Sequence, residues 1–356
     1  MSRDLVIQSH RGPYHLWYDE RPFDKLIREI SADSHFIIDR KVAGLYSEEL
    51  KPILAHSSVL LIEATEGAKS FERIGHYVSH LLAQKIRRGN RLVAIGGGII
   101  QDITCFLAAI LLRGIQWHYY PTTLLAQADS CIGSKSSINF GEIKNVLGTF
   151  TPPEEITICS RFLDTLEEID LRSGIGEMLK VHAIDGPKSF DRIATEYDQL
   201  LLDRTTLMNA VYRSLLIKKK YIEEDEFDKG IRLVMNYGHS FAHAIESATH
   251  YEIPHGIAVT IGLDMANFIS VHTARMAEHH FYRMHPTLKK NYIKFSPAKI
   301  TTASFLNAIV KDKKNSADGL VLILPNAEAC VERVSIAADE TFGNLCQEYF
   351  NSVMAH

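Results

Sequence analysis

Cysteine is scarce in this chain, and the few cysteines are not arranged as a disulfide framework. The five cysteines are scattered, odd in number and form no CxxC pair. Free thiols in a reducing compartment are typical of such a pattern. The sequence therefore predicts a soluble protein of the cytoplasm.

Long apolar runs and an excess of charge are also missing. No uncharged apolar run reaches the roughly 18 to 20 residues that a membrane helix needs. The N-terminal MSRDLVIQSHRGPY lacks the basic segment and apolar core of a signal peptide. The formal net charge of -4 gives no general attraction to nucleic acid or to an anionic membrane. We therefore expect neither as a partner, and an anionic ligand must be held by a local basic cluster.

Strand-like and helical segments alternate in the N-terminal part of the chain. The segment HFIIDR predicts a strand ending at Asp39, SVLLI predicts a second buried strand through Ile62, and residues 71–86 predict an amphipathic helix. Strands joined in this way indicate a parallel α/β sheet. An acidic residue after a strand can bind an adenine ribose, but Asp39 can equally cap the next helix.

The second half of the chain is mostly helical. The pair Pro152-Pro153 cannot continue a helix or a central strand. Helical periodicity then extends from Leu166 to about Thr273. At 356 residues the chain is long enough for two domains. We therefore predict an α/β fold with domains 1–165 and 166–356, the second mostly helical.

A glycine turn is the first candidate for a binding site. Residues 91–95 predict a buried strand that runs into Gly96-Gly97-Gly98, and Asp102 lies just inside the following helix. Glycines at a helix N-terminus let a phosphate approach free backbone N–H groups. The motif is neither GxGxxG nor GxxxxGK[ST], so a plain strand-to-helix turn stays open. The loop-rich run that follows concentrates polar side chains among small residues: Thr122, Thr123, Asp129, Lys135, Lys144 and Asn145.

One single lysine and one lysine cluster are further candidates for binding residues. Lys218 falls on the apolar stripe of a helix expected over about 205–224, so its side chain either snorkels to solvent or points into a cleft. Lys311, Lys313 and Lys314 form a small basic cluster before a short apolar strand, for which a solvated loop is the default interpretation.

Histidines concentrate in the segment GIRLVMNYGHSFAHAIESATHYEIPHG. His239 and His243 are four residues apart on one helix face, so both could ligate a metal, and His255 in a loop could complete a site. Glu177 is a candidate for the carboxylate ligand. Lys180 lies three residues on, and the alternative for this pair is a surface ion pair.

The pieces together resemble the dehydroquinate synthase family of sugar phosphate cyclases. The resemblance implies a Rossmann-like N-terminal domain that binds NAD, a mostly helical C-terminal domain that binds a divalent metal, usually zinc and possibly cobalt, an active site in the cleft between them, and a homodimer. It covers roughly residues 35 to 325 in order. The matching segments are GGGIIQD, LLRG, PTTLLAQADSCIGSK, KNVLGTF, LRSGIGEMLK, IKKKYIEEDEFDKGIRLVMNYGHSFAHAIE, PHG and DKK.

The same resemblance assigns roles to single residues. Glu177, His239 and His255 match the metal ligands, whereas His243 matches a contact to the substrate phosphate. Arg113 matches a residue that reaches the phosphate site of the partner subunit. The positions that match NAD contacts are Asp39, Glu66, Lys69, Gly97, Gly98, Asp102, Thr122 and Thr123, with Lys144 contacting cofactor or substrate. The positions that match the pocket for a phosphorylated sugar acid are Asp129, Lys135, Asn145, Lys180, Lys218, Arg232, Asn236, His243 and a lysine of the pair Lys313-Lys314.

The substrate expected from the resemblance is 3-deoxy-arabino-heptulosonate 7-phosphate. A guanidinium is the natural partner for its carboxylate, and Arg232 stands at the matching position. The alternatives are a cyclase of sedoheptulose 7-phosphate or glucose 6-phosphate, an NAD- and metal-dependent alcohol dehydrogenase of the glycerol dehydrogenase type, and a non-catalytic binding protein. Three residues depart from the family pattern: Gln101 replaces the small residue usual before the aspartate, Ser134 replaces a glycine before Lys135, and Ile257 replaces a glutamate.

Overall fold

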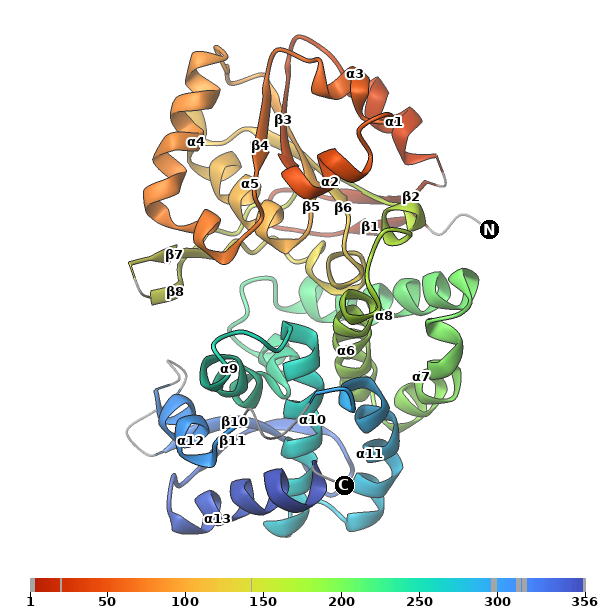
Figure 1. Ribbon diagram of the computed structural model, residues 1–356, viewed down its shortest axis with the longest axis vertical. Helices are drawn as coiled ribbons and strands as arrows, with labels where there is room; N and C mark the ends of the chain where they lie inside the picture. The colour runs from red at the N-terminus through yellow and green to blue at the C-terminus, as the bar shows by residue number, and fades with distance from the viewer. Residues whose placement is uncertain are drawn as a thin grey trace. The chain divides into compact units, whose positions relative to one another are not determined.

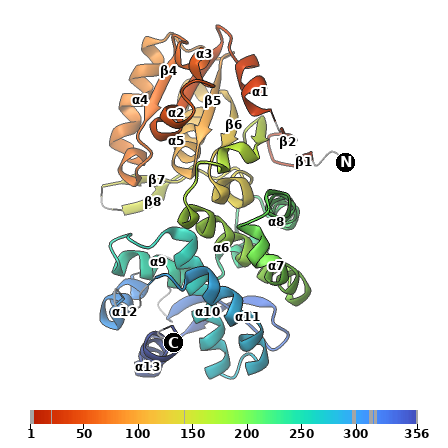
Figure 2. The ribbon, with the colours of Figure 1, turned by 45° about the vertical axis from the view of Figure 1, so that its right-hand side comes forward.

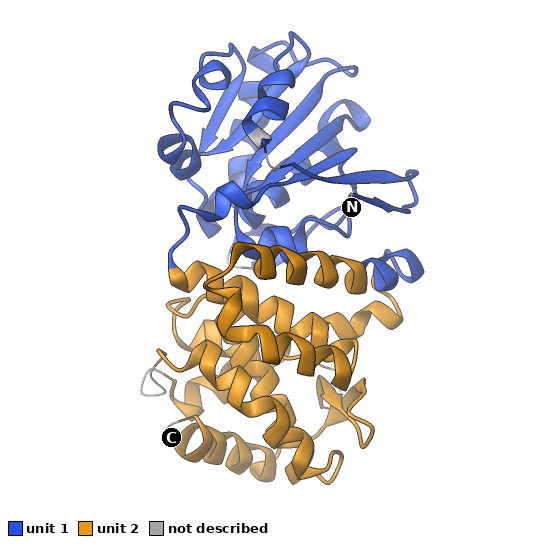
Figure 3. Ribbon diagram, turned by 90° about the vertical axis from the view of Figure 1, so that its right-hand side faces the viewer, with its two compact units in different colours: residues 1–167, 219–227 blue, residues 168–218, 228–356 orange. Residues whose placement is uncertain are grey.

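The computed structural model describes residues 4–19, 21–141, 143–295, 300–311, 315 and 319–354, and Figure 1 shows the course of the chain. The chain forms two compact units. Unit 1 comprises residues 1–167 and 219–227, and unit 2 comprises residues 168–218 and 228–356 (Figure 3). Residues 219–227 therefore pack with the N-terminal unit, although the helix to which most of them belong begins in unit 2.

Unit 1 is built on a seven-stranded sheet with the order β1-β2-β9-β6-β5-β3-β4. Among its described strands, β1 and β2 pair antiparallel and all other neighbours pair parallel. The α/β prediction is therefore confirmed. The strands are β1 Leu5–Ile7, β2 Tyr14–Tyr18, β3 Ser34–Asp39, β4 Val59–Ile62, β5 Arg91–Gly96, β6 Gln116–Pro121 and β9 Glu155–Ile158.

The central strands are buried on both faces, as is usual for a parallel sheet. Residues Leu92 to Ile95 of β5 are fully buried, whereas β4 lies at the edge and is only partly covered, so the expectation of a buried strand there was wrong. Helices α1, α2 and α3 pack on one face, and α4 and α5 lie on the other side (Figure 1). These helices are α1 Pro22–Arg28, α2 Arg40–Leu45, α3 Lys51–Leu54, α4 Phe71–Ala83 and α5 Gly98–Ile110.

Shorter elements of unit 1 occupy the stretch that the sequence predicted as loop-rich. A single turn of π-helix and a small hairpin replace much of the expected loop. The short elements of the unit are η1 Glu66–Lys69, η2 Leu111–Arg113, η3 Ala126–Ser130, β7 Ile138–Phe140, β8 Ile143–Leu147 and η4 Ser160–Leu163.

Unit 2 is organised around α10, in which residues 256–270 are all buried. This helix contacts α6, α9, α11 and the strand β10, and Figure 2 shows it among these helices. The expected helical stretch is confirmed. The helices are α6 Glu168–Ile184, α7 Pro187–Leu200, α8 Arg204–Glu224, η5 Ile231–Asn236, α9 His239–Ala248, α10 His255–His272, α11 Glu278–Tyr292, α12 Thr302–Val310, α13 Glu340–Glu348 and η7 Tyr349–Val353.

One hairpin of unit 2 was only half predicted. The strand β10 (Leu320–Pro325) is fully buried and was expected from its apolar run, but it pairs antiparallel with β11 (Val331–Ile336). Exposed and half-buried residues make up β11, so it has no apolar run that would predict a strand. None of the described helices is long and apolar enough to cross a membrane.

Candidate functional site

The glycine turn of unit 1 joins β5 to the N-terminus of α5. A Cβ added to Gly96 would lie 2.4 Å from Ile100 Cγ1, and one added to Gly97 would lie 2.9 Å from Thr123 Cγ2. A Cβ added to Gly98 would meet no described atom within 4 Å. The first two glycines are therefore required by packing within the protein. The third leaves open space at the start of the helix, where backbone N–H groups can receive an anion.

Four residues expected in binding roles form one polar network beside this turn. The ammonium of Lys69 donates to Asp102 Oδ2 at 2.9 Å and to Asn145 Oδ1 at 2.9 Å, and it lies 3.5 Å from Glu66 Oε1. Burial lowers the pKa of Lys69, but the carboxylates of Asp102 and Glu66 outweigh burial and raise it. Lys69 therefore stays charged, and it joins residues that lie far apart in the sequence.

Asp39, at the end of β3, caps the next helix. Its Oδ1 accepts a hydrogen bond from the backbone N–H of Lys41 at 2.9 Å, and it is the N-cap residue of α2. The capping interpretation is therefore confirmed. A contact between Asp39 and a ribose stays a prediction.

Gln101, one of the departures from the family pattern, has a structural role. Its side-chain amide donates to the carbonyl oxygen of Ser130 at 2.5 Å and accepts from Ser130 Oγ at 2.7 Å. These bonds tie α5 to the end of the π-helix η3. The buried Asp129 belongs to this π-helix, so Gln101 supports the backbone that positions Asp129. Thr122 is buried and Thr123 half-buried at the end of β6, and Lys144 is half-buried in β8.

In unit 2, a close crossing of two helices brings together Glu177 and His255. A Cβ added to Gly256 would lie 1.7 Å from the carbonyl oxygen of Ser173, and one added to Gly176 would lie 2.0 Å from the carbonyl oxygen of Gly256. The backbones of α6 and α10 can approach in this way only without side chains. Because Gly176 precedes Glu177 and Gly256 follows His255, the crossing places the carboxylate beside the imidazole.

A second close approach positions His239. A Cβ added to Gly262 of α10 would lie 2.2 Å from the carbonyl oxygen of Gly238. Gly238 adopts a left-handed φ of 76° and is the N-cap of α9, whose first residue is His239. The same helix α10 therefore sets the backbone next to all three ligand candidates.

Glu177, His239 and His255 bring one ligand atom each to within 4.8 Å of one another. His255 Nε2 lies 3.1 Å and His239 Nε2 3.7 Å from Glu177 Oε1. Two imidazole nitrogens and one carboxylate are a donor set that binds zinc and related divalent metals while leaving positions for substrate or water. The residues present therefore fit a divalent metal.

The charge of Glu177 is secured by its neighbour. Lys180 Nζ lies 2.6 Å from Glu177 Oε2, and both side chains are buried, so the surface ion-pair interpretation is wrong. Burial alone would raise the pKa of Glu177, but Lys180 and His255 outweigh burial and hold it well below its usual range. Glu177 is therefore ionised, as a metal ligand must be.

Glu246 is a residue of this site that sequence reasoning missed. Its Oε1 lies 3.1 Å from His255 Nδ1, on the opposite edge of the ring from Glu177. A carboxylate behind a ligating histidine fixes the tautomer and the ring orientation. The spacing along α9 offered a signal, because Glu246 lies three residues after His243 on the same helix.

His243 lies beside this group but is not part of it. Its ring centroid is 5.8 Å from that of His239 and 6.2 Å from that of His255, and its side chain is exposed. From helical spacing alone, His243 was a candidate metal ligand. The third ligand atom instead comes from His255, across the helix crossing.

The other residues expected around the substrate differ in how deeply they are buried. Lys218 and Arg232 are buried, which argues against snorkelling of Lys218, and Asn236 Nδ2 donates to the carbonyl oxygen of Leu233 at 3.1 Å. Ile257 is fully buried, so the departure next to His255 places an apolar side chain in the core. Lys311 is exposed, and Lys313 and Lys314 lie outside the described residues.

A second group of possible metal ligands lies in unit 1 but is already bonded internally. Glu29, His118 and Glu155 also bring ligand atoms to within 4.8 Å of one another. Glu29 Oε1, however, accepts from Tyr120 OH at 2.9 Å and contacts His118 Nδ1 at 2.9 Å, and Lys25 Nζ lies 3.0 Å from Glu155 Oε2. We therefore interpret this group as a buried polar network that stabilises the sheet.

Comparison with known proteins gives matches along most of the chain. The model of the 3-dehydroquinate synthase N-terminal domain matches residues 59–173, and that of the C-terminal domain matches residues 174–315. A 3-dehydroquinate synthase of Alkaliphilus metalliredigens is 32% identical over 308 residues, covering 85% of this chain and 86% of the relative. Another, from Campylobacter concisus, is 33% identical over 327 residues, covering 91% and 92%.

Solved structures share the fold over nearly the whole chain. A 2-epi-5-epi-valiolone synthase from Streptomyces hygroscopicus, with NAD+ and Zn2+ bound, superposes with a TM-score of 0.83 at 24% identity, covering 95% of this chain and 96% of that one. A 2-deoxy-scyllo-inosose synthase in complex with carbaglucose-6-phosphate, NAD+ and Co2+ gives a TM-score of 0.84 at 22% identity, covering 98% and 100%. At these identities the likeness establishes the fold.

Proposed function

The chain belongs to the 3-dehydroquinate synthase family, and from this premise we propose that unit 1 binds NAD and unit 2 binds a divalent metal. The function is that of a 3-dehydroquinate synthase, which cyclises 3-deoxy-arabino-heptulosonate 7-phosphate to 3-dehydroquinate with release of phosphate, in the shikimate pathway of aromatic amino acid biosynthesis. The observation that carries the proposal is the convergence of Glu177, His239 and His255, held by the glycine crossings of α10.

The two cofactors divide the chemistry. When bound, NAD takes and returns a hydride at a secondary alcohol, and a divalent metal such as zinc or cobalt polarises the oxygen of that alcohol. The chain supplies the surroundings of these groups. Glu177, His239 and His255 would hold the metal, and Lys180 would keep Glu177 ionised through its 2.6 Å contact.

Basic and polar side chains would hold the substrate. Arg232 would pair with the carboxylate, because a guanidinium can bind both of its oxygens. Ammonium, imidazole and amide groups near the leaving phosphate stabilise the charge that develops as the phosphate departs. The residues proposed for this role are Lys135, Asn145, Lys180, Lys218, Asn236 and His243, with Asp129 nearby and Lys313 or Lys314 as a further contact.

The same proposal assigns the cofactor contacts in unit 1. The N-terminus of α5 suits the pyrophosphate of NAD, because a Cβ at Gly98 would meet no described atom within 4 Å and the first N–H groups of a helix have no acceptor within it. The side chains proposed to surround the dinucleotide are Asp39, Glu66, Lys69, Asp102, Thr122, Thr123 and Lys144.

We also propose that the protein is a cytoplasmic homodimer in which Arg113 reaches the phosphate site of the partner subunit. Arg113 is exposed, and it follows Leu112 in a turn where φ is 50° at Leu112, 69° at Arg113 and 116° at Gly114. Non-glycine residues with such angles are costly, and strained turns of this kind concentrate at functional positions. The turn leaves Arg113 exposed to solvent.

Phosphate release from three substrates tests the function. The purified protein with NAD and zinc is expected to release phosphate from 3-deoxy-arabino-heptulosonate 7-phosphate and to leave sedoheptulose 7-phosphate and glucose 6-phosphate unchanged. Arg232→Ala should lower kcat/KM by about 10- to 100-fold, because charged hydrogen bonds to the carboxylate are lost. Arg192→Ala is the matched control, since Arg192 is exposed and pairs only with Glu196 among the contacts described.

The other outcomes of this assay identify the alternatives. Turnover of a neutral sugar phosphate, with Arg232→Ala fully active, would assign the chain to a different cyclase. Steady accumulation of NADH from an alcohol without phosphate release would indicate a dehydrogenase of the glycerol dehydrogenase type. The carbocyclic product is identified by mass and NMR.

Gly97→Ala and Gly98→Ala are expected to separate packing from cofactor binding. Gly97→Ala should destabilise the protein by about 1–3 kcal/mol, because its Cβ meets Thr123 at 2.9 Å. Gly98→Ala should leave the thermal midpoint nearly unchanged. Gly98→Ala should bind NAD about tenfold more weakly, since its methyl group enters the open space that the pyrophosphate needs, whereas Gly97→Ala should change the NAD affinity less, because its methyl group points at Thr123. Calorimetry with NAD and thermal melts measure both effects. Unchanged NAD affinity in Gly98→Ala would place the pyrophosphate elsewhere.

A further inference from the structure

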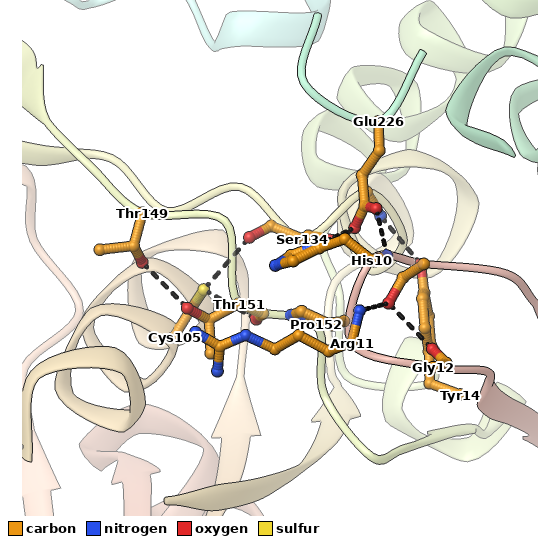
Figure 4. Close-up of polar contacts among 12 residues, drawn as sticks. His10, Arg11, Gly12, Tyr14, Cys105, Ser134, Thr149, Thr151, Pro152 and Glu226 are labelled. Atoms are coloured by element: carbon orange, nitrogen blue, oxygen red, sulfur yellow. Dashed lines mark hydrogen bonds and ion pairs between the residues drawn. The ribbon is translucent and has the colours of Figure 1, made fainter. Parts of the chain in front are cut away.

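Glu226 lies where three segments of unit 1 meet. It belongs to residues 219–227, which comprise the end of α8 and the residues directly after it and which pack with unit 1. Glu226 Oε1 accepts a hydrogen bond from Ser134 Oγ at 2.6 Å, and Oε2 accepts one from the backbone N–H of His10 at 2.7 Å. His10 Nδ1 lies 3.1 Å from Oε1. Figure 4 shows Ser134 and His10 together at the Glu226 carboxylate.

The carboxylate is enclosed and charged. Only 9% of the Glu226 side chain is exposed. Burial raises its pKa, but the hydrogen bonds from Ser134 and His10 outweigh burial and lower it. The Phe227 ring lies 5.2 Å from that of His10 and 5.1 Å from that of Phe150, so apolar contacts flank the polar junction. A charge held in this way positions its hydrogen-bond donors firmly.

The backbone that Glu226 holds is the one that carries Lys135. Ser134 has a φ of 65°, a left-handed conformation that favours glycine. Its carbonyl oxygen accepts from the backbone N–H of Thr151 at 2.7 Å, and the backbone N–H of Gly133 donates to Tyr14 OH at 3.2 Å. The same loop is also held by Cys105 Sγ, which donates to the Ser134 carbonyl oxygen at 3.5 Å, and by an antiparallel bridge between Lys135 and Phe150. Among the described contacts, the hydroxyl bond to Glu226 is the one that ties Ser134 to residues 219–227.

This arrangement also explains the departure at position 134. The family pattern has a glycine there, which adopts a positive φ without strain. A serine at that φ is disfavoured, but its hydroxyl adds a charge-assisted hydrogen bond to a partly buried carboxylate, worth more than a neutral one. The serine therefore lacks the backbone freedom of glycine, but its hydrogen bond holds the loop in one conformation.

We propose that Glu226 is a positioning residue that acts through Ser134 and fixes the backbone from which Lys135 reaches the substrate. This inference rests on the proposed role of Lys135 in binding the phosphorylated substrate. The same carboxylate also holds His10 of the N-terminal segment, which Glu223 binds separately, with Glu223 Oε1 accepting from the backbone N–H of Gln8 at 2.8 Å.

Glu223 provides a matched control. It lies three residues before Glu226 and binds the same N-terminal segment, but its described contacts are to Gln8 and Lys219 and none is to Ser134. Glu226→Gln and Ser134→Ala are each expected to lower kcat/KM for the sugar phosphate by about 10- to 100-fold, as small displacements of a catalytic group do. The double variant should lose little more than either single one, because both remove one interaction. Glu223→Gln should stay within about twofold of the parent.

Rates are expressed per NAD-binding site. A variant with a smaller folded fraction would otherwise show a lower rate even if the position of Lys135 were unchanged. Hydrogen exchange of the amides of residues 133–136 gives a readout that needs no activity: we expect at least about tenfold faster exchange in Glu226→Gln and Ser134→Ala, and no change in Glu223→Gln. If the protein turned over none of the three substrates, the exchange result would still test the anchor, and the proposed function would fail separately. Unchanged kcat/KM in Glu226→Gln, additive losses in the double variant, or equal effects of Glu223→Gln would each overturn the inference.

Discussion

Glu177→Gln is expected to leave the protein without stoichiometric metal and to lower phosphate release by about 1,000-fold. The amide is nearly isosteric with the carboxylate but carries no charge, so it is a poor metal ligand. The loss corresponds to the several kcal/mol that a metal contributes as a Lewis acid. The change also removes the charge that lies 2.6 Å from Lys180. Metal content after gel filtration and phosphate release at saturating NAD measure the two effects.

Glu246→Gln provides the graded comparison for this prediction. It leaves the three ligands in place and alters only the partner of His255 Nδ1. Changes of such partners cost about 10- to 100-fold in metal affinity, so Glu246→Gln should retain metal at high concentration and lose it under a competing chelator. A Glu177→Gln protein that still carries one metal ion per chain would show that the ion binds elsewhere.

Gly256→Ala is expected to destabilise unit 2 by at least about 3 kcal/mol and to abolish metal binding, although it changes no ligand. The new methyl group would lie 1.7 Å from the carbonyl oxygen of Ser173, so α6 and α10 must move apart. That movement separates His255 from Glu177, which lie at this crossing. A fall of roughly 10 °C in the thermal midpoint is expected, with metal content near zero.

Gly75→Ala is the matched control for a helical glycine. Gly75 lies in α4, and a Cβ there would meet no described atom within 4 Å. Because alanine favours helix, this variant should be as stable as the parent or more stable by about 0.5–1 kcal/mol. If Gly256→Ala melted like the parent and kept its metal, the close crossing would not be what positions the site.

Local patterns predicted much of unit 1. The apolar runs, the glycine turn and the helix after it indicated a parallel α/β sheet, because strand and helix periodicities are properties of short segments. They did not reveal the bonds of Lys69 to Asp102 and Asn145, because these residues lie 33 and 76 positions away in the chain. The edge position of β4 was also hidden, since the order of strands depends on how distant segments pair.

In unit 2 the histidines also show the difference between what local spacing predicts and what depends on the packing of distant segments. Helical spacing placed His239 and His243 on one face and left both as candidate ligands, with His255 as a further candidate, and only the resemblance to a family favoured His255 over His243. The structure brings His255 to Glu177 because α10 crosses α6 at two glycines, and no spacing along the chain encodes that crossing. The strand β11 was missed because it consists of exposed and half-buried residues.

The sequence by itself determined the class of fold, the glycine turn, the helical second half and, through its resemblance to a family, the reaction, and it predicted the residues that would carry this reaction. Only the tertiary structure decided that Lys180 pairs with Glu177 in a buried environment, that Glu246 lies behind His255, and that Glu226 holds both His10 and Ser134. The physical reason is that periodicity and turn chemistry act between neighbours in the chain. Burial and hydrogen bonding act between residues that are close in space, and the packing of helices and strands determines which residues these are.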